Sequence, residues 1–155
     1  KIWKAPRWAL AAFLEAVQEG VALTINKPAG TALNDVMIAS IAMRPETITI
    51  TPPSGWVYLG RIDNGNANQS SQVGYYKVAG GSEPASYSWT LSASHTGAVG
   101  GILTFRNVST TALLDTGNVQ NTPSGLVHTT PSVTTTGAGR ISSWLTYIFR
   151  IWLPG

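Results

Sequence analysis

Residues 21–139 carry apolar and polar side chains in the two-residue alternation that is typical of β-strands. Tyr87, Trp89 and Leu91 fall on one face of their segment, and the serine and threonine residues between them fall on the other. The run 35–43 is apolar on both faces, as expected for a central strand. No stretch of this region has the helical pattern of roughly 10–15 residues that βαβ units require. The pattern therefore predicts an all-β fold, an antiparallel β-sandwich or jelly roll.

Turn residues (Gly, Pro, Asn and Ser) separate the apolar segments at short intervals. The Asn64-Gly65 dipeptide predicts a hairpin turn with positive φ. The predicted strands cover residues 21–25, 35–43, 47–50, 56–62, 72–78, 86–91 and 98–105, with weaker ones at 113–120, 126–129 and 132–136.

Residues 1–20 have a helical pattern instead. Trp8, Ala11 and Glu15 follow three- and four-residue steps, Pro6 suits a first helical turn, and Gly20 suits a C-cap. A basic start before an apolar run is also typical of a signal peptide, but Glu15 interrupts the run and no small-residue cleavage site follows. We expect a short amphipathic N-terminal helix or arm packed on the domain or on a neighbour.

Residues 140–155 form a third region, and its segment Trp144–Leu153 holds one charge in ten residues. It is too short for a transmembrane helix, which needs about 20 residues. As a strand it is apolar on both faces, so both faces need cover. Three interpretations stay open: a closing strand of the sandwich, a strand donated to a neighbouring subunit, and contact with a membrane interface.

The charge distribution argues against a nucleic-acid partner. Residues 21–139 hold five basic and five acidic side chains, so the formal charge of +3 arises from the two ends. A phosphate-binding surface needs several Lys or Arg gathered on one face. The 14 Ser and 18 Thr supply a solvent face of hydroxyl groups, and the absence of cysteine excludes disulfides and Cys-ligated metals.

Groups able to carry catalysis are scarce, because the chain has seven acidic residues and two histidines. His95 and His128 stand apart in the sequence, and there is no Gly-x-Ser-x-Gly motif or His pair at metal-ligand spacing. The acidic residues lie at predicted strand ends and turns. We therefore expect a protein that is not an enzyme.

Two binding sites are conceivable. Asp63, Asn64 and Asn66 offer the hard oxygen ligands that calcium prefers, although their spacing misses the EF-hand pattern and one carboxylate binds weakly. A plain hairpin loop is the other interpretation, and we expect no other cofactor. Exposed aromatic rings could stack on a glycan, or they could simply be core residues; the candidates are Trp56, Tyr58, Tyr75 and Tyr76.

Several short motifs combine turn and core residues: Leu23–Thr31, Asn34–Ala39, Pro52–Trp56, Tyr75–Ala79, Glu83–Trp89, Gly100–Ile102 and Thr130–Val133. Together, over about residues 21–136, they resemble a β-sandwich module common in large bacterial exported and phage-associated proteins. The resemblance implies a non-catalytic structural or adhesive module located outside the cell, at the cell surface or on a virion.

Residues 1–20 and 140–155 depart from the module's pattern, as if its last strands were replaced by the apolar tail. A truncated sandwich leaves an open edge, which favours self-association. We therefore expect a homo-oligomer or filament in which a terminal segment completes a neighbour. The assembly candidates are the large aromatic residues at the two ends: Trp3, Trp8, Phe13, Trp144, Tyr147, Phe149 and Trp152. A carbohydrate-binding module is the alternative function.

Overall fold

The computed structural model describes residues 20–65, 70–95, 97–111, 113–120 and 141–146. These residues form strands, and no helix occurs among them. The strands are β1 (Gly20–Asn26), β2 (Val36–Arg44), β3 (Ile50–Thr51), β4 (Val57–Asp63), β5 (Ser71–Val78), β6 (Ser86–His95), β7 (Gly97–Phe105), β8 (Leu114–Gln120) and β9 (Ile141–Thr146).

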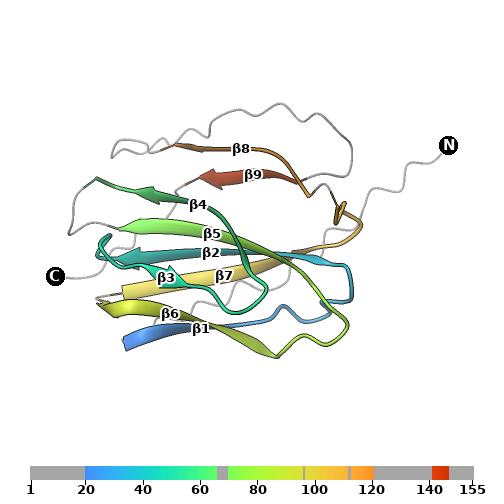
Figure 1. Ribbon diagram of the computed structural model, residues 1–155, viewed down its shortest axis with the longest axis horizontal. Helices are drawn as coiled ribbons and strands as arrows, with labels where there is room; N and C mark the ends of the chain where they lie inside the picture. The colour runs from blue at the N-terminus through green and yellow to red at the C-terminus, as the bar shows by residue number, and fades with distance from the viewer. Residues whose placement is uncertain (1–19, 66–69, 96, 112, 121–140, 147–155) are drawn as a thin grey trace.

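Two antiparallel sheets form the body of the molecule (Figure 1). One has the order β1-β6-β3, and the other has the order β4-β5-β2-β7. This arrangement confirms the predicted all-β sandwich. The described part of the chain holds no helix long and apolar enough to cross a membrane.

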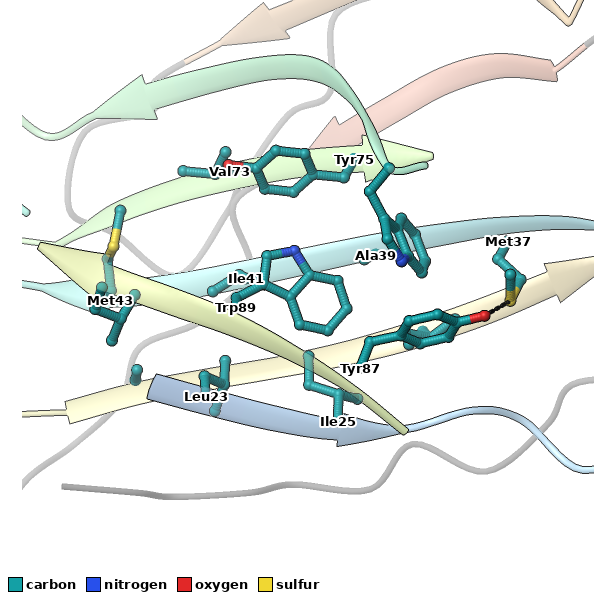
Figure 2. Packing of buried hydrophobic residues seen from close by; sticks show 14 of the residues in the cluster. Leu23, Ile25, Met37, Ala39, Ile41, Met43, Val73, Tyr75, Tyr87 and Trp89 are labelled. Atoms are coloured by element: carbon teal, nitrogen blue, oxygen red, sulfur yellow. Dashed lines mark hydrogen bonds between the residues drawn. The ribbon is translucent and has the colours of Figure 1, made fainter. Parts of the chain in front are cut away.

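Side chains from both sheets fill the space between them (Figure 2). Tyr87, Trp89 and Leu91 all point into this core, as their alternation with hydroxyl residues predicts. Trp89 also packs against Trp56, whose ring centroid lies 5.2 Å away. The remaining large members of the core include Leu23, Ile25, Met37, Ile41, Met43, Ile48, Val73 and Tyr75.

The sheets approach most closely where β1 faces β7, because β7 places a glycine there. A Cβ atom on Gly100 would lie 2.6 Å from Cδ1 of Ile25, and 3.1 Å from atoms of both Ile41 and Leu23. The missing side chain thus allows the two edges to close over the core.

The predicted strand 47–50 is wrong, since only Ile50–Thr51 pairs as β3. The preceding residues form a turn in which the Ile48 amide donates to the Pro45 carbonyl, and Arg61 donates to the Ile48 carbonyl. These contacts satisfy backbone groups that a strand would have paired. The alternation still placed the side chains correctly, because Ile48 is in the core and Ile50 packs against it.

The other predicted strands up to Phe105 match β1, β2 and β4 to β7 within a few residues, and Gly65 has the positive φ expected in the hairpin turn. The predicted strand 113–120 corresponds to β8, which pairs with β9 in parallel rather than antiparallel orientation. Only residues 141–146 of the predicted apolar tail are described. The predicted strands 126–129 and 132–136, and the predicted helix before Gly20, lie outside the described residues.

Candidate functional site

Charged side chains tie loops to strands at both ends of the sandwich. At one end the buried carboxylate of Asp35, just before β2, receives two hydrogen bonds from Arg106, just after β7, at 2.8 and 2.9 Å. It also accepts the Ala32 amide at 2.8 Å, while Arg106 donates to the Gly30 carbonyl at 2.8 Å. This ion pair fixes the β1–β2 loop against the end of β7.

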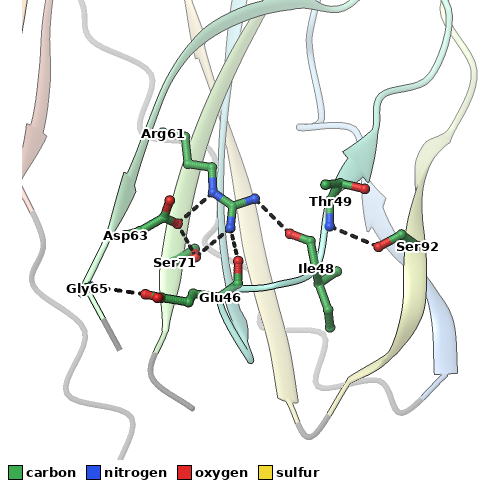
Figure 3. A network of polar contacts seen from close by, with 8 residues as sticks. All are labelled: Glu46, Ile48, Thr49, Arg61, Asp63, Gly65, Ser71 and Ser92. Carbon is green, nitrogen blue, oxygen red and sulfur yellow. Dashed lines mark hydrogen bonds and ion pairs between the residues drawn. The ribbon is translucent and has the colours of Figure 1, made fainter. Parts of the chain in front are cut away.

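Arg61 organises the opposite end (Figure 3). Its guanidinium donates to the carboxylate of Asp63 at 2.6 Å and to the Ser71 hydroxyl at 2.9 Å, which joins β4 to β5. It also donates to the backbone carbonyls of Glu46 and Ile48. One side chain therefore secures the turn that leads from β2, in the same sheet as Arg61, to β3 of the other sheet.

A third cluster lies where the β5–β6 connection meets the aromatic core. The carboxylate of Glu83 accepts from Lys77 Nζ at 2.8 Å, from the Tyr87 hydroxyl at 2.6 Å and from the Gly80 amide at 2.7 Å. Lys77 Nζ also lies 5.3 Å from the centre of the Tyr87 ring. The hydroxyl of Tyr87 is 3.8 Å from the sulfur of Met37, so the cluster reaches the core.

These contacts hold all three carboxylates in their charged forms. Hydrogen bonds from Arg106 lower the pKa of Asp35. Burial raises the pKa of both Asp63 and Glu83, but hydrogen bonds from Ser71 and Arg61, and from Lys77 and Tyr87 respectively, outweigh burial and leave each pKa below its ordinary value. A general acid or base works best with a pKa near the working pH. The pKa values of these three carboxyl groups are instead shifted away from neutral pH, to below their ordinary values.

The glycan-binding candidates divide between the core and the surface. Trp56 and Tyr75 are buried in the core, where a surface ligand cannot stack on them. Tyr58 is 57% exposed and Tyr76 is partly exposed. Tyr58 pairs with Tyr75 across the β4–β5 ladder, so it lies on the inward side of the sheet, while Tyr76 points to the opposite side. The two accessible rings therefore do not form one platform.

The calcium candidates are only partly described. Oδ1 of Asp63 already accepts hydrogen bonds from Arg61 and Ser71. The backbone N–H of Asn64 donates to the Ser70 carbonyl at 3.3 Å. Asn66 lies outside the described residues. Within the described ranges no three His, Asp or Glu residues are grouped so that they could hold a metal ion.

The assembly candidates lie almost entirely outside the described residues; these are Trp3, Trp8, Phe13, Tyr147, Phe149 and Trp152. The backbone of Trp144 belongs to β9, opposite Asn118 of β8.

Sequence reasoning missed all three polar clusters, which lie around Asp35, Arg61 and Glu83. Lys77 and Glu83 are six residues apart on either side of a Gly-Gly pair, and this spacing in a strand–turn–strand segment was a usable signal. Nothing in the sequence near Arg61 points to the carbonyl groups of residues 46 and 48, because the contact depends on where the folded chain places the β2–β3 turn relative to β4.

The comparisons with known proteins supply no family for this chain. No protein-family model, no curated protein and no solved structure matched it.

Proposed function

We propose that this chain is a non-enzymatic structural subunit of an extracellular assembly, at a bacterial cell surface or on a virion, and that it joins neighbouring copies through its terminal segments. The observation that carries the proposal is that acidic side chains of the described residues are held in ion pairs within the fold. Asp35 and Glu83 each form an ion pair that ties two segments of the sandwich together. Asp63 pairs with Arg61 of its own strand, and Arg61 in turn binds the carbonyl groups of the turn between β2 and β3. The lowered pKa values of the three carboxyl groups suit permanent structural pairs rather than proton transfer.

The resemblance of residues 21–136 to a β-sandwich module of exported and phage-associated proteins supports the extracellular setting. The apolar, aromatic ends of the chain support assembly, because large aromatic residues contribute most to interface energies. Glycan binding has less support, since Trp56 and Tyr75 are buried and the rings of Tyr58 and Tyr76 lie on opposite sides of the sheet.

Light scattering coupled to size-exclusion chromatography tests this function. We expect the full chain to elute with a mass above the 16.4 kDa of one copy and to dissociate on dilution. The double variant Phe149→Ala, Trp152→Ala should shift the population toward the monomer, while the matched variant Tyr58→Ala, which leaves the ends intact, should not. A monomer at all concentrations would refute assembly.

A further inference from the structure

Strands β8 and β9 form a sheet of their own beside β4 (Figure 1). They run parallel, with Leu114 opposite Ile141 and Gln120 opposite Thr146. Among the described strands, β9 pairs with β8 and with no strand of either antiparallel sheet. Two strands alone are marginally stable in water, and parallel pairing is slightly weaker per residue than antiparallel pairing. The pair therefore needs support beyond its own hydrogen bonds.

The sandwich does not rely on β9. The core cluster of the described residues runs from Leu23 to Ile102, so it is assembled from the part of the chain that ends with β7. Among the described strands, β8 is the one along which β9 packs, and β8 in turn meets the sandwich at β4. β9 can therefore leave β8 of its own chain without breaking a strand pair of the two antiparallel sheets.

The connection from β8 to β9 is long enough to place β9 on another copy. The twenty residues 121–140 can extend to about 66–72 Å. Returning from Gln120 to Ile141, which lies opposite Leu114, needs only about 20 Å at the usual rise of a strand. A globular chain of this length has a radius of gyration of about 15 Å and is roughly 40 Å across. The connection can span that distance.

A strand pair closed by a short turn has no such freedom. Residues 64–70 connect β4 to β5, and the backbone N–H of Asn64 donates to the Ser70 carbonyl at 3.3 Å, which closes this hairpin within one chain. No turn sets the register of β8 and β9, because a parallel pair is joined by a long crossover. β9 of a second copy can make the same backbone pairs with β8, which is why exchange of an identical element is a low-cost route to assembly.

Exchange also supplies the cover that the strand pair lacks within one copy. Parallel sheets are almost always covered on both faces. Next to β8, the strand β4 exposes Val57 and Tyr58 by 47% and 57% in a single copy. When β9 comes from a neighbour, the sandwich of that neighbour is tethered to the same pair of strands. The pair then has a folded body on each side, and the apolar surface of β4 gains a partner.

We propose that copies of this chain exchange β9, so that β9 of one copy pairs in parallel with β8 of another in the register observed within one chain. This inference rests on the proposed function and deepens it, because it names the strand that is donated and the strand that accepts it. Reciprocal exchange closes a dimer, and exchange in one direction builds a filament.

Single-cysteine variants test the exchange, since the natural chain has no cysteine. One variant carries Gln120→Cys and the other carries Thr146→Cys, at positions that stand opposite each other across the strand pair. Opposed positions on neighbouring strands lie within the separation that a disulfide can bridge. The two variants are mixed in denaturant, refolded together and oxidised mildly. The matched control mixes Ser88→Cys with Thr146→Cys, because Ser88 is exposed on the outer side of the three-stranded sheet.

We expect a disulfide between residues 120 and 146 of different chains, at several-fold higher yield than the cross-link in the control mixture. Peptide mapping separates it from a disulfide between two chains of the same variant. Gly117→Cys mixed with Ser143→Cys repeats the test at a second opposed pair, and circular dichroism establishes that each variant is folded. Cross-linking no better than the control at both pairs would overturn the exchange.

The double variant Gln120→Cys, Thr146→Cys shows where β9 pairs when both cysteines are in one chain. A disulfide formed only within single chains would also overturn the exchange. Light scattering on the natural chain reports on assembly separately. A chain that assembles while β9 stays on its own β8 refutes the exchange and leaves the proposed function standing. A chain that is monomeric at all concentrations refutes the proposed function, and the exchange with it.

Discussion

Gly100→Ala is the sharpest single test of how the two sheets close on each other. The added Cβ would lie 2.6 Å from Ile25 Cδ1, where carbon atoms ordinarily stay about 3.5–4.0 Å apart. Atoms of Ile41 and Leu23 would each lie 3.1 Å from the same Cβ, so the Cβ cannot move away from Ile25 without approaching them. All three side chains are buried, so relief requires movement of the core.

The expected size of the effect comes from two opposing terms. Overpacking of this kind costs about 1–3 kcal/mol, while replacing glycine by alanine restricts the unfolded chain and stabilises by about 0.4–1 kcal/mol. Gly60→Ala is the matched control, because its Cβ meets nothing within 4 Å. The difference in stability between the two variants therefore measures the overpacking alone. For a chain of this size, the overpacking should lower the melting temperature of Gly100→Ala by about 2–12 °C relative to Gly60→Ala.

Urea unfolding followed by tryptophan fluorescence measures both variants, and a double-mutant cycle identifies the cause. Ile25→Val removes the Cδ1 atom and costs about 0.5–1.5 kcal/mol on its own. In that background Gly100→Ala should cost at least about 0.5 kcal/mol less than in the natural chain, since contacting residues are not additive. Additive losses, or a Gly100→Ala variant as stable as Gly60→Ala, would refute the proposed close approach.

Three further predictions concern the charged clusters. Glu83→Gln should lower the free energy of unfolding by about 1–3 kcal/mol at pH 7, because charged hydrogen bonds are lost. Glu46→Gln is the control, because the hydrogen bond that its carboxylate accepts from the Gly65 amide is exposed. It should lower the free energy of unfolding by less, and equal losses would contradict the argument. Because folding lowers the pKa of Asp35 and Glu83 below the ordinary 3.8 and 4.5, their stabilisation is complete above those values. It should fall away as the solution is acidified below about pH 4, and a melting temperature constant down to pH 2 would count against it. Burial, with the Glu83 hydrogen bond, raises the pKa of Tyr87 above its ordinary 10.0. Stability should therefore decline above pH 10, and Tyr87→Phe should remove that part of the decline.

Hydrophobic alternation predicted most of the sandwich because each strand has one face in the core. The residues Tyr87, Trp89 and Leu91 show this clearly, and all three are buried. Alternation failed at residues 47–50, where the side-chain faces were right but the backbone forms a turn. The alternation of apolar and polar residues shows which side of the chain meets the core. It does not show whether the backbone groups form hydrogen bonds with a neighbouring strand or with a distant arginine.

A row of small residues illustrates a stricter limit on what one sequence reveals. Gly60, Gly74, Ser40 and Gly101 stand opposite one another across the four-stranded sheet. They come from four strands, and within its own strand each glycine signals only a local bend or bulge. They stand in one row only in the observed register. A two-residue shift of β7 would bring Leu103 or Val99 opposite Ser40 in place of Gly101. Surface shape across a sheet is therefore a property of strand pairing, which has no period along the chain. That explains why the sequence points to aromatic residues such as Tyr76 and gives no sign of the small residues that strand pairing places beside them.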